Sequence, residues 1–156
     1  MQLHHRKTIP FTAERLEQMQ IEFEQLQQKE KEVLKRLTTA REMGDLSENG
    51  AYKYAKFELG SVRRQMNQLR KFLDKGFAIS QSSHSDSVTF GSVVTIQNKQ
   101  QEQTFTIVNK HESDMAQKKL SNTSPIGKAL MHKKVGESVK VETPGGSQTV
   151  TILKIA

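Results

Sequence analysis

Two apolar stripes with heptad spacing dominate the first half of the chain. In each stripe the steps between apolar residues alternate between three and four, and the first stripe is interrupted only where Glu30 takes an apolar place. A stripe of this kind follows one side of an α-helix and needs a second helix to cover it. The first half therefore predicts two long helices packed on each other. The stripes comprise Leu16, Met19, Phe23, Leu26, Val33, Leu37 and Ala40, and then Tyr52, Ala55, Leu59, Val62, Met66, Leu69 and Leu73.

The residue numbers also predict how the two helices face each other. Helices joined by a short connection pack antiparallel, so the numbers of facing residues must have a constant sum. That sum is 92 for Ala40 with Tyr52 and equally for Val33 with Leu59, which places the apex at Leu46 and the turn over residues 44–49. At ~1.5 Å per residue, about 30 residues from the first apolar position to the apex form a rod roughly 45 Å long.

The second half has a different pattern. Residues 77–91 are rich in serine and predict a linker. Short alternating runs then follow, separated by turn residues, and they predict an antiparallel sheet. Ser124 followed by Pro125 is a helix start, and residues 143–146 form a turn between the last two strands. The alternating runs cover residues 92–97, 104–109, 138–143 and 148–154.

We therefore expect an α+β protein with three parts. Residues 1–76 form an antiparallel coiled-coil hairpin, residues 77–91 a linker, and residues 92–156 a small domain built on a sheet. The hydrophobic fraction of 34% is below the usual ~45–50%. That deficit is expected when a thin two-helix rod takes up half of the chain.

Composition narrows the functional classes. No apolar run approaches the ~20 residues of a membrane helix, and the first residues do not resemble a secretory signal. Cysteine is absent, which excludes disulfides and thiolate metal sites. We expect a protein of the cytoplasm. The formal charge of +7, from 24 basic and 17 acidic residues, favours a polyanionic or acidic partner.

The predicted apex contains two acidic residues, Asp45 and Glu48. One interpretation is structural: Asp45 or Ser47 caps the second helix, and Glu48 lies near its first turn, as in a capping box. The other is functional: two carboxylates at the end of a thin rod are offered to a cation that a partner also holds. Mg²⁺ prefers carboxylate and water oxygens and is often bound by only one or two protein carboxylates. Both interpretations stay open on the residues alone.

Two segments resemble a known family. The segment REMGDLSENGAYKYAKFE at 41–58 resembles the hairpin-tip signature of the bacterial transcript cleavage factors, the GreA/GreB family. The segment SNTSPIGKALMHKKVGESVKVETPGG at 121–146 resembles the C-terminal domain of the same family. The resemblance extends over nearly the whole chain. It implies an N-terminal antiparallel coiled coil followed by an FKBP-like α+β domain.

The resemblance also implies an activity. Such factors bind bacterial RNA polymerase and stimulate the polymerase's own cleavage of backtracked nascent RNA, so the factor is not itself the enzyme. Carried over by motif position, Asp45 and Glu48 would be the catalytic pair, which holds Mg²⁺ jointly with the polymerase while the isolated protein binds none. Thr123, Ser124 and Pro125 would dock on the polymerase at the rim of its secondary channel, which the hairpin enters.

Basic residues of the hairpin are candidate RNA contacts. By resemblance, Arg41, Lys53 and Lys56 would contact the extruded RNA, along with other basic residues mixed among acids. Such contacts to phosphates hold RNA without reading its sequence. The resemblance also implies DNA binding, and we expect a monomer.

The chain departs from the family pattern at three places. Residues 49–52 read Asn-Gly-Ala-Tyr where Asn-Ala-Glu-Tyr is common, so one acid is missing at Ala51. Thr123 stands where Asn or Asp is frequent, and residues 131–132 read Met-His where Leu-Gly is usual. These departures leave open a second interpretation, a regulator of the same fold that enters the channel without stimulating cleavage. A third interpretation takes the C-terminal domain as a prolyl isomerase or chaperone.

Overall fold

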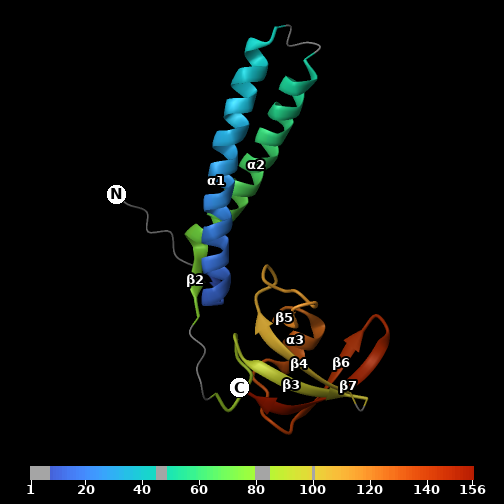
Figure 1. Ribbon diagram of the computed structural model, residues 1–156. Coiled ribbons are helices and arrows are strands. Elements are labelled where there is room, and N and C mark those ends of the chain that lie inside the picture. The colour runs from blue at the N-terminus through green and yellow to red at the C-terminus, as the bar shows by residue number, and fades with distance from the viewer. Residues whose placement is uncertain (1–7, 45–48, 80–84, 100) are drawn as a thin grey trace. The chain divides into compact units, whose positions relative to one another are not determined.

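The computed structural model describes residues 8–44, 49–79, 85–99 and 101–156 (Figure 1). The chain divides into two compact units. One contains Leu16–Gly76, and the other combines Ile9–Arg15 with Phe77–Ala156.

Two long helices form the first unit. Helix α1 spans Ala13–Glu42 and helix α2 spans Gly50–Lys75, and they run side by side from the apex (Figure 1). Every predicted stripe position is buried or half-buried. The predicted hairpin is confirmed, and its turn falls between the two helices as expected. Residues 45–48 of that turn lie outside the described residues.

Side-chain contacts between the two helices test the predicted register. In three of four contacting pairs the residue numbers add to 93, 94 and 93, within two of the predicted 92, whereas in the fourth, Lys29 with Glu58, they add to 87. Glu30, the polar interruption of the stripe, is half-buried and binds a cation from the opposite helix. The three contacts are Glu30 Oε1 to Arg63 Nε at 2.6 Å, Glu58 Oε2 to an Arg36 guanidinium nitrogen at 2.8 Å, and the Arg70 guanidinium at 5.6 Å from the ring centre of Phe23.

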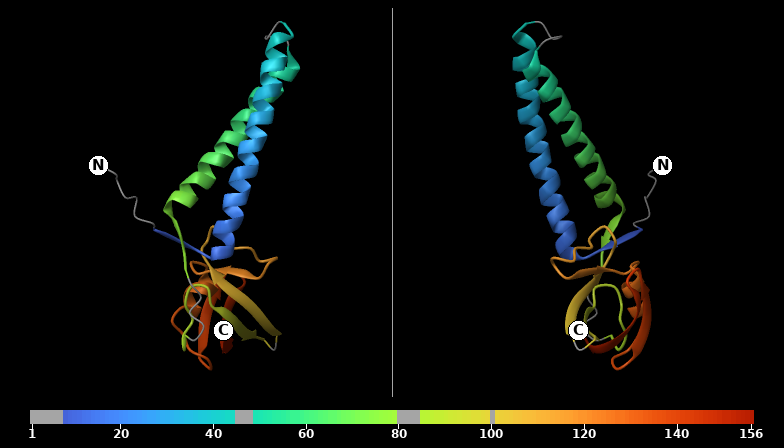
Figure 2. Two further views of the ribbon diagram at one scale, coloured as in Figure 1. Left: turned by 60° about the vertical axis from the view of Figure 1, so that its left-hand side comes forward. Right: turned by 90° about the vertical axis from the view of Figure 1, so that its right-hand side faces the viewer.

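The two helices lie closest near the apex and diverge toward their other ends (Figure 2). Buried stripe residues occur along the whole length of the hairpin, from Met19 to Val33 on α1 and from Ala55 to Met66 on α2. Strand β1 (Ile9–Phe11) precedes α1 and strand β2 (Gly76–Ala78) follows α2, and they pair in a two-stranded sheet.

The second unit is built on a five-stranded sheet with the order β5-β4-β3-β7-β6. The pairings β3/β4, β3/β7 and β6/β7 are antiparallel, as predicted, but β4 and β5 pair in parallel, so the sheet is mixed. The sequence did not reveal β5 because a strand of three residues shows no alternation. The strands are β3 (Val93–Asn98), β4 (Gln101–Val108), β5 (Lys119–Ser121), β6 (Ser138–Thr143) and β7 (Gly146–Ile155), and the short helix α3 spans Pro125–Leu130.

One face of this sheet and α3 share a single apolar core. Val94, Ile107 and Ile152 from the sheet and Leu130 from α3 are completely buried there. Val88, from the segment predicted as a linker, joins the same core, and its backbone N–H donates to the Lys133 carbonyl at 2.8 Å.

A predicted turn joins the last two strands. Thr143 pairs with Gly146 across it. Gly146 has φ +112°, a region that only glycine enters readily. The turn expected over residues 143–146 is therefore confirmed.

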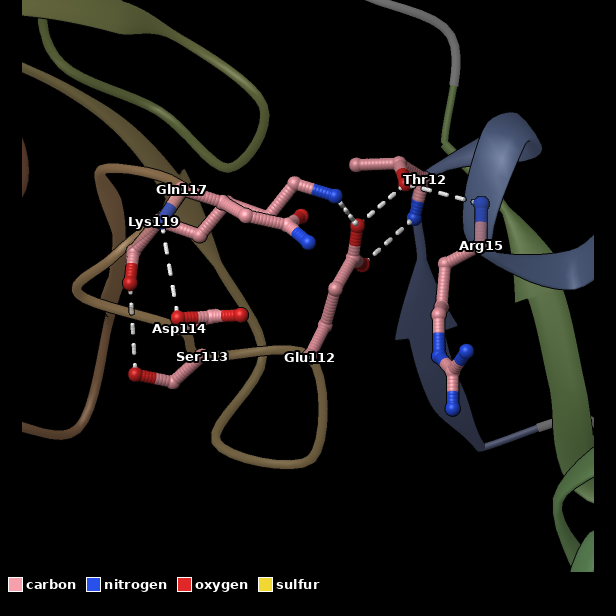
Figure 3. Close-up of polar contacts among 7 residues, drawn as sticks. All are labelled: Thr12, Arg15, Glu112, Ser113, Asp114, Gln117 and Lys119. Carbon is pink, nitrogen blue, oxygen red and sulfur yellow. Dashed lines mark hydrogen bonds and ion pairs between the residues drawn. The ribbon is translucent and has the colours of Figure 1, made fainter. Parts of the chain in front are cut away.

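A buried carboxylate holds the start of α1 within the second unit (Figure 3). Glu112 is only 5% exposed. Its side chain accepts hydrogen bonds from the Thr12 backbone N–H, at 3.1 Å, and from the Thr12 hydroxyl. The Lys119 ammonium, 3.5 Å away, balances its charge. The Thr12 hydroxyl also accepts from the Arg15 N–H at 3.2 Å. Thr12 is thus the N-cap of α1, and Glu112 fixes that cap.

The register can be tested with paired cysteines. Val33→Cys with Leu59→Cys should form a disulfide readily on oxidation, because both residues point into the same layer of the hairpin. The control pair Val33→Cys with Met66→Cys should not, since seven residues shift the partner by ~10 Å along the helix. Non-reducing electrophoresis gives the answer, and efficient oxidation of the control pair would contradict the register.

The Thr12 cap can be tested separately. Thr12→Val keeps the side-chain shape but removes the hydroxyl, so it should lower the free energy of unfolding by roughly 1–2 kcal/mol. Thr12→Ser keeps the hydroxyl and should lose much less. Urea denaturation of both variants measures the difference, and equal losses would show that the hydroxyl contributes nothing.

Candidate functional site

Asn49 closes the apex of the hairpin by binding both helices. It is the N-cap of α2, where its side-chain oxygen accepts from the Tyr52 N–H at 3.1 Å. Its side-chain nitrogen donates to the Ala40 carbonyl, in the last turn of α1, at 2.6 Å. Helix ends leave such N–H and carbonyl groups without partners inside the helix. A single amide therefore satisfies one group at the end of each helix.

This cap differs from the one that the sequence suggested. The capping-box interpretation assigned the cap to Asp45 or Ser47 and put Glu48 near the first turn. The structure shows Asn49 as the cap, and the first turn of α2 contains no acidic residue. Asparagine is as good an N-cap as aspartate or serine. The sequence signal for this cap is that Asn49 lies three residues before Tyr52, the first residue of the second apolar stripe.

The two predicted tip acids, Asp45 and Glu48, lie outside the described residues. The structure describes the residues on both sides of them, Gly44 and Asn49. Gly44 has φ +120°, so a side chain at this position would strain the backbone.

Over residues 31–58 the sequence has six basic and five acidic residues, so the charge near the apex is almost balanced. Arg41, Lys53 and Lys56, the predicted RNA contacts, are all exposed, Arg41 on α1 and the two lysines on α2. Glu58 is already paired, with Arg36 at 2.8 Å and with Lys29 at 3.6 Å. Over the described residues 31–44 and 49–57, the bases are Lys31, Lys35, Arg36, Arg41, Lys53 and Lys56, and the acids are Glu32 and Glu42.

The predicted polymerase-docking residues come together at the start of α3. Ser124 is the N-cap: its hydroxyl accepts from the Gly127 N–H at 3.0 Å and donates to the Ser121 carbonyl at 2.7 Å. A Cβ on Gly127 would lie 2.0 Å from the same carbonyl oxygen, so only glycine fits there. Thr123 and Pro125 on either side of the cap are exposed. The helix start is confirmed; the docking role remains a prediction.

Two further searches cover the described residues only. Among them, no three His, Cys, Asp or Glu side chains are placed so that they could share a metal ion. No helix in that part of the chain is both long and apolar enough to cross a membrane.

Comparison with known proteins identifies the class. The pattern of the family described as "Transcription elongation factor, N-terminal" matches residues 9–75, and that of "Transcription elongation factor, GreA/GreB, C-term" matches residues 82–156. Together they span both structural units, so the chain has the domain pair of a transcription elongation factor. It belongs to the GreA/GreB family.

Two individual relatives agree with this family assignment. Transcription elongation factor GreA of Thermotoga neapolitana is 40% identical over 152 residues, which cover 96% of this chain and 97% of that protein. GreA of Bacillus subtilis is 40% identical over 153 residues, with 96% and 98% covered. Among solved structures, GreA factor homolog 1 (Gfh1) of Thermus thermophilus is 22% identical, with a TM-score of 0.45 and with 95% of this chain and 98% of that chain covered.

The two roles of Asn49 can be separated by substitution. Asn49→Ala loses both hydrogen bonds and should lower the free energy of unfolding of the hairpin by roughly 1–2 kcal/mol. Asn49→Asp keeps the acceptor for Tyr52 N–H but loses the donor to Ala40, so an intermediate loss is expected. Circular dichroism during thermal melting measures both. A wild-type melting curve for Asn49→Ala would contradict the closing role.

Proposed function

We propose that this protein binds bacterial RNA polymerase, inserts its hairpin into the secondary channel and stimulates cleavage of backtracked nascent RNA by the polymerase. Membership of the GreA/GreB family supports a role in transcription elongation. The structural observation that favours the role of the tip is the Asn49 cap. Because Asn49 caps α2, neither Asp45 nor Ser47 is needed for that purpose.

The hairpin is suited to reach a recessed site. Helix α1 has 30 residues, which at ~1.5 Å per residue is about 45 Å of helix. Only one stripe of each helix is buried, so the hairpin is no thicker than two helices. In our proposal its length brings the apex to the RNA while the rest of the chain remains outside the channel.

The residues of the apex fit a shared Mg²⁺ ion. Asp45 and Glu48 supply the hard oxygen ligands that Mg²⁺ prefers, whereas the Asn49 amide is committed to the two helix ends. When bound, Mg²⁺ activates water and stabilises the charge that develops on the leaving oxygen. The two carboxylates would hold the ion from one side and orient the attacking water, and the polymerase would provide the other ligands and the RNA.

The second unit would supply the docking contact. Thr123 and Pro125 are exposed on either side of Ser124, and the bonds of Ser124 to Ser121 and Gly127 fix the loop that presents them. We assign binding of the polymerase to this loop, so binding and cleavage depend on different structural units.

One observation favours a second candidate, a regulator that enters the channel without stimulating cleavage. Ala51 is exposed in the first turn of α2, at the place where the family commonly has an acid. Incubation with a stalled elongation complex carrying end-labelled RNA separates the two candidates. Shortened RNA supports the cleavage factor; changed elongation rates with intact RNA support the regulator.

The tip acids can be tested without disturbing the fold. Asp45→Ala and Glu48→Ala should leave the melting temperature almost unchanged, because Asn49 provides the cap. RNA cleavage should fall at least ~10-fold when Mg²⁺ is limiting, and added Mg²⁺ should restore part of it, since each variant lacks a ligand.

Glu42→Ala is the matched control, because Glu42 is an exposed acid at the end of α1. This variant should stimulate cleavage by the polymerase as strongly as the wild type does. Wild-type stimulation of cleavage by both tip variants would end the catalytic assignment. A lower melting temperature with intact cleavage would support a capping role instead.

A further inference from the structure

Strand β6 forms one edge of the five-stranded sheet, beside β7. It has six residues, Ser138–Thr143. The opposite edge is β5, which has three residues, and the Lys119 backbone of β5 already exchanges hydrogen bonds with Asp114 at 2.8 and 3.0 Å. An edge strand with unpaired backbone groups is a template for a further strand. Strand β6 is therefore the edge at which this sheet can be extended.

Every second residue of β6 directs its backbone groups away from β7. Ile152 of β7 exchanges backbone hydrogen bonds with residues 136 and 137, directly before β6, so its N–H and carbonyl face β6. Alternate residues of an antiparallel strand face the same neighbour, so Val150 also faces β6, where its register partner is Val139. The even-numbered residues of β6 therefore point to the free edge, and no hydrogen bond within the described residues engages their backbone groups. They are Ser138, Lys140 and Glu142.

Two of these residues place opposite charges along the edge. Lys140 and Glu142 are both exposed, and their register partners on β7 are the uncharged Thr149 and Ser147. Neither charge has an ion pair within the part of the chain that the structure describes. Like charges directly opposite each other destabilise a strand pair. A strand that fits this edge must therefore present an acid to Lys140 and a base to Glu142.

We propose that β6 pairs with β6 of a second copy of this chain. In an antiparallel pair centred on Val141, Lys140 lies opposite the partner's Glu142, and Glu142 lies opposite the partner's Lys140. The backbone groups of these residues point to the free edge, so the same two pairs are the hydrogen-bonded ones. A shift of two residues in either direction would place lysine opposite lysine or glutamate opposite glutamate, so the charges select one register.

A lysine in an edge strand normally opposes pairing with other strands. Here only a strand that presents an acid at the right position neutralises it, which makes the pairing selective and reversible. The proposal replaces the monomer expected from the sequence. It does not rest on the proposed function, because β6 is part of neither the hairpin nor the docking loop.

Sedimentation velocity of the full chain over a range of concentrations tests this pairing. The wild type should show a monomer–dimer equilibrium. Lys140→Glu and Glu142→Lys each place like charges opposite each other, so each variant alone should dissociate with a constant at least ~10-fold higher. An equimolar mixture of the two variants should form heterodimers, because each chain then meets the opposite charge. The double variant Lys140→Glu/Glu142→Lys should dimerise as the wild type does.

A charge control and a thiol cross-link test the position of the contact. Lys154→Glu makes the same change in net charge at an exposed residue of β7, away from the edge, and should dimerise as the wild type does. Val141→Cys adds a thiol to a chain without cysteine and places it opposite its own copy, so oxidation should give a covalent dimer. Val139→Cys would lie opposite the partner's Thr143 and should cross-link far less on non-reducing electrophoresis.

Several outcomes would overturn the proposal. These are a wild type that stays monomeric at the highest soluble concentration, equal losses for Lys140→Glu and Lys154→Glu, and a mixture of the two edge variants that associates no more than either alone. Dimers of wild-type strength in both edge variants would assign self-association to another surface. Circular dichroism of each variant distinguishes a lost contact from a lost fold.

Discussion

The narrow contact between two antiparallel helices governs the rest of this structure. A pair of helices can bury only one stripe on each, so most of the other side chains of the hairpin are exposed to water. That constraint explains why 34% hydrophobic residues are enough for a folded chain. It also leaves backbone groups at the two helix ends of the apex without partners inside their helices, and the Asn49 side chain binds one such group at each end. The surface that remains is available for charge and for exposed rings such as Tyr54.

The parts of the fold that were predictable are those with a repeated signal. The heptad stripes predicted both helices and placed facing residues within two positions of the contacts between Glu30 and Arg63 and between Arg36 and Glu58. Ser124-Pro125 predicted the start of α3 because an N-cap followed by proline is a local signal. Where many residues repeat the same spacing, one atypical residue does not change the predicted helix. The start of α3 is likewise predictable because two neighbouring residues define it.

The parts that were missed depend on contacts between distant residues. Strand β5 has three residues, and only its parallel partner β4 defines it. Three residues near the apex, Asp45, Ser47 and Asn49, are all suited to capping, and the choice between them is made by where α2 begins. The bond from Glu112 to Thr12 joins residues 100 positions apart. A pocket beside Tyr54 is lined by residues of both helices, among them Met43 of α1 and Ala51 of α2.

The constant sum of facing residues limits how such a hairpin can change in evolution. An insertion in one arm alone would turn every following apolar residue away from its partner. Equal insertions in both arms preserve the pairing, but only in units close to seven residues, because other lengths rotate the stripe around the helix. Each such unit adds ~10 Å. The length of the hairpin can therefore change only in coarse steps, a restriction that does not apply to the identity of its exposed residues.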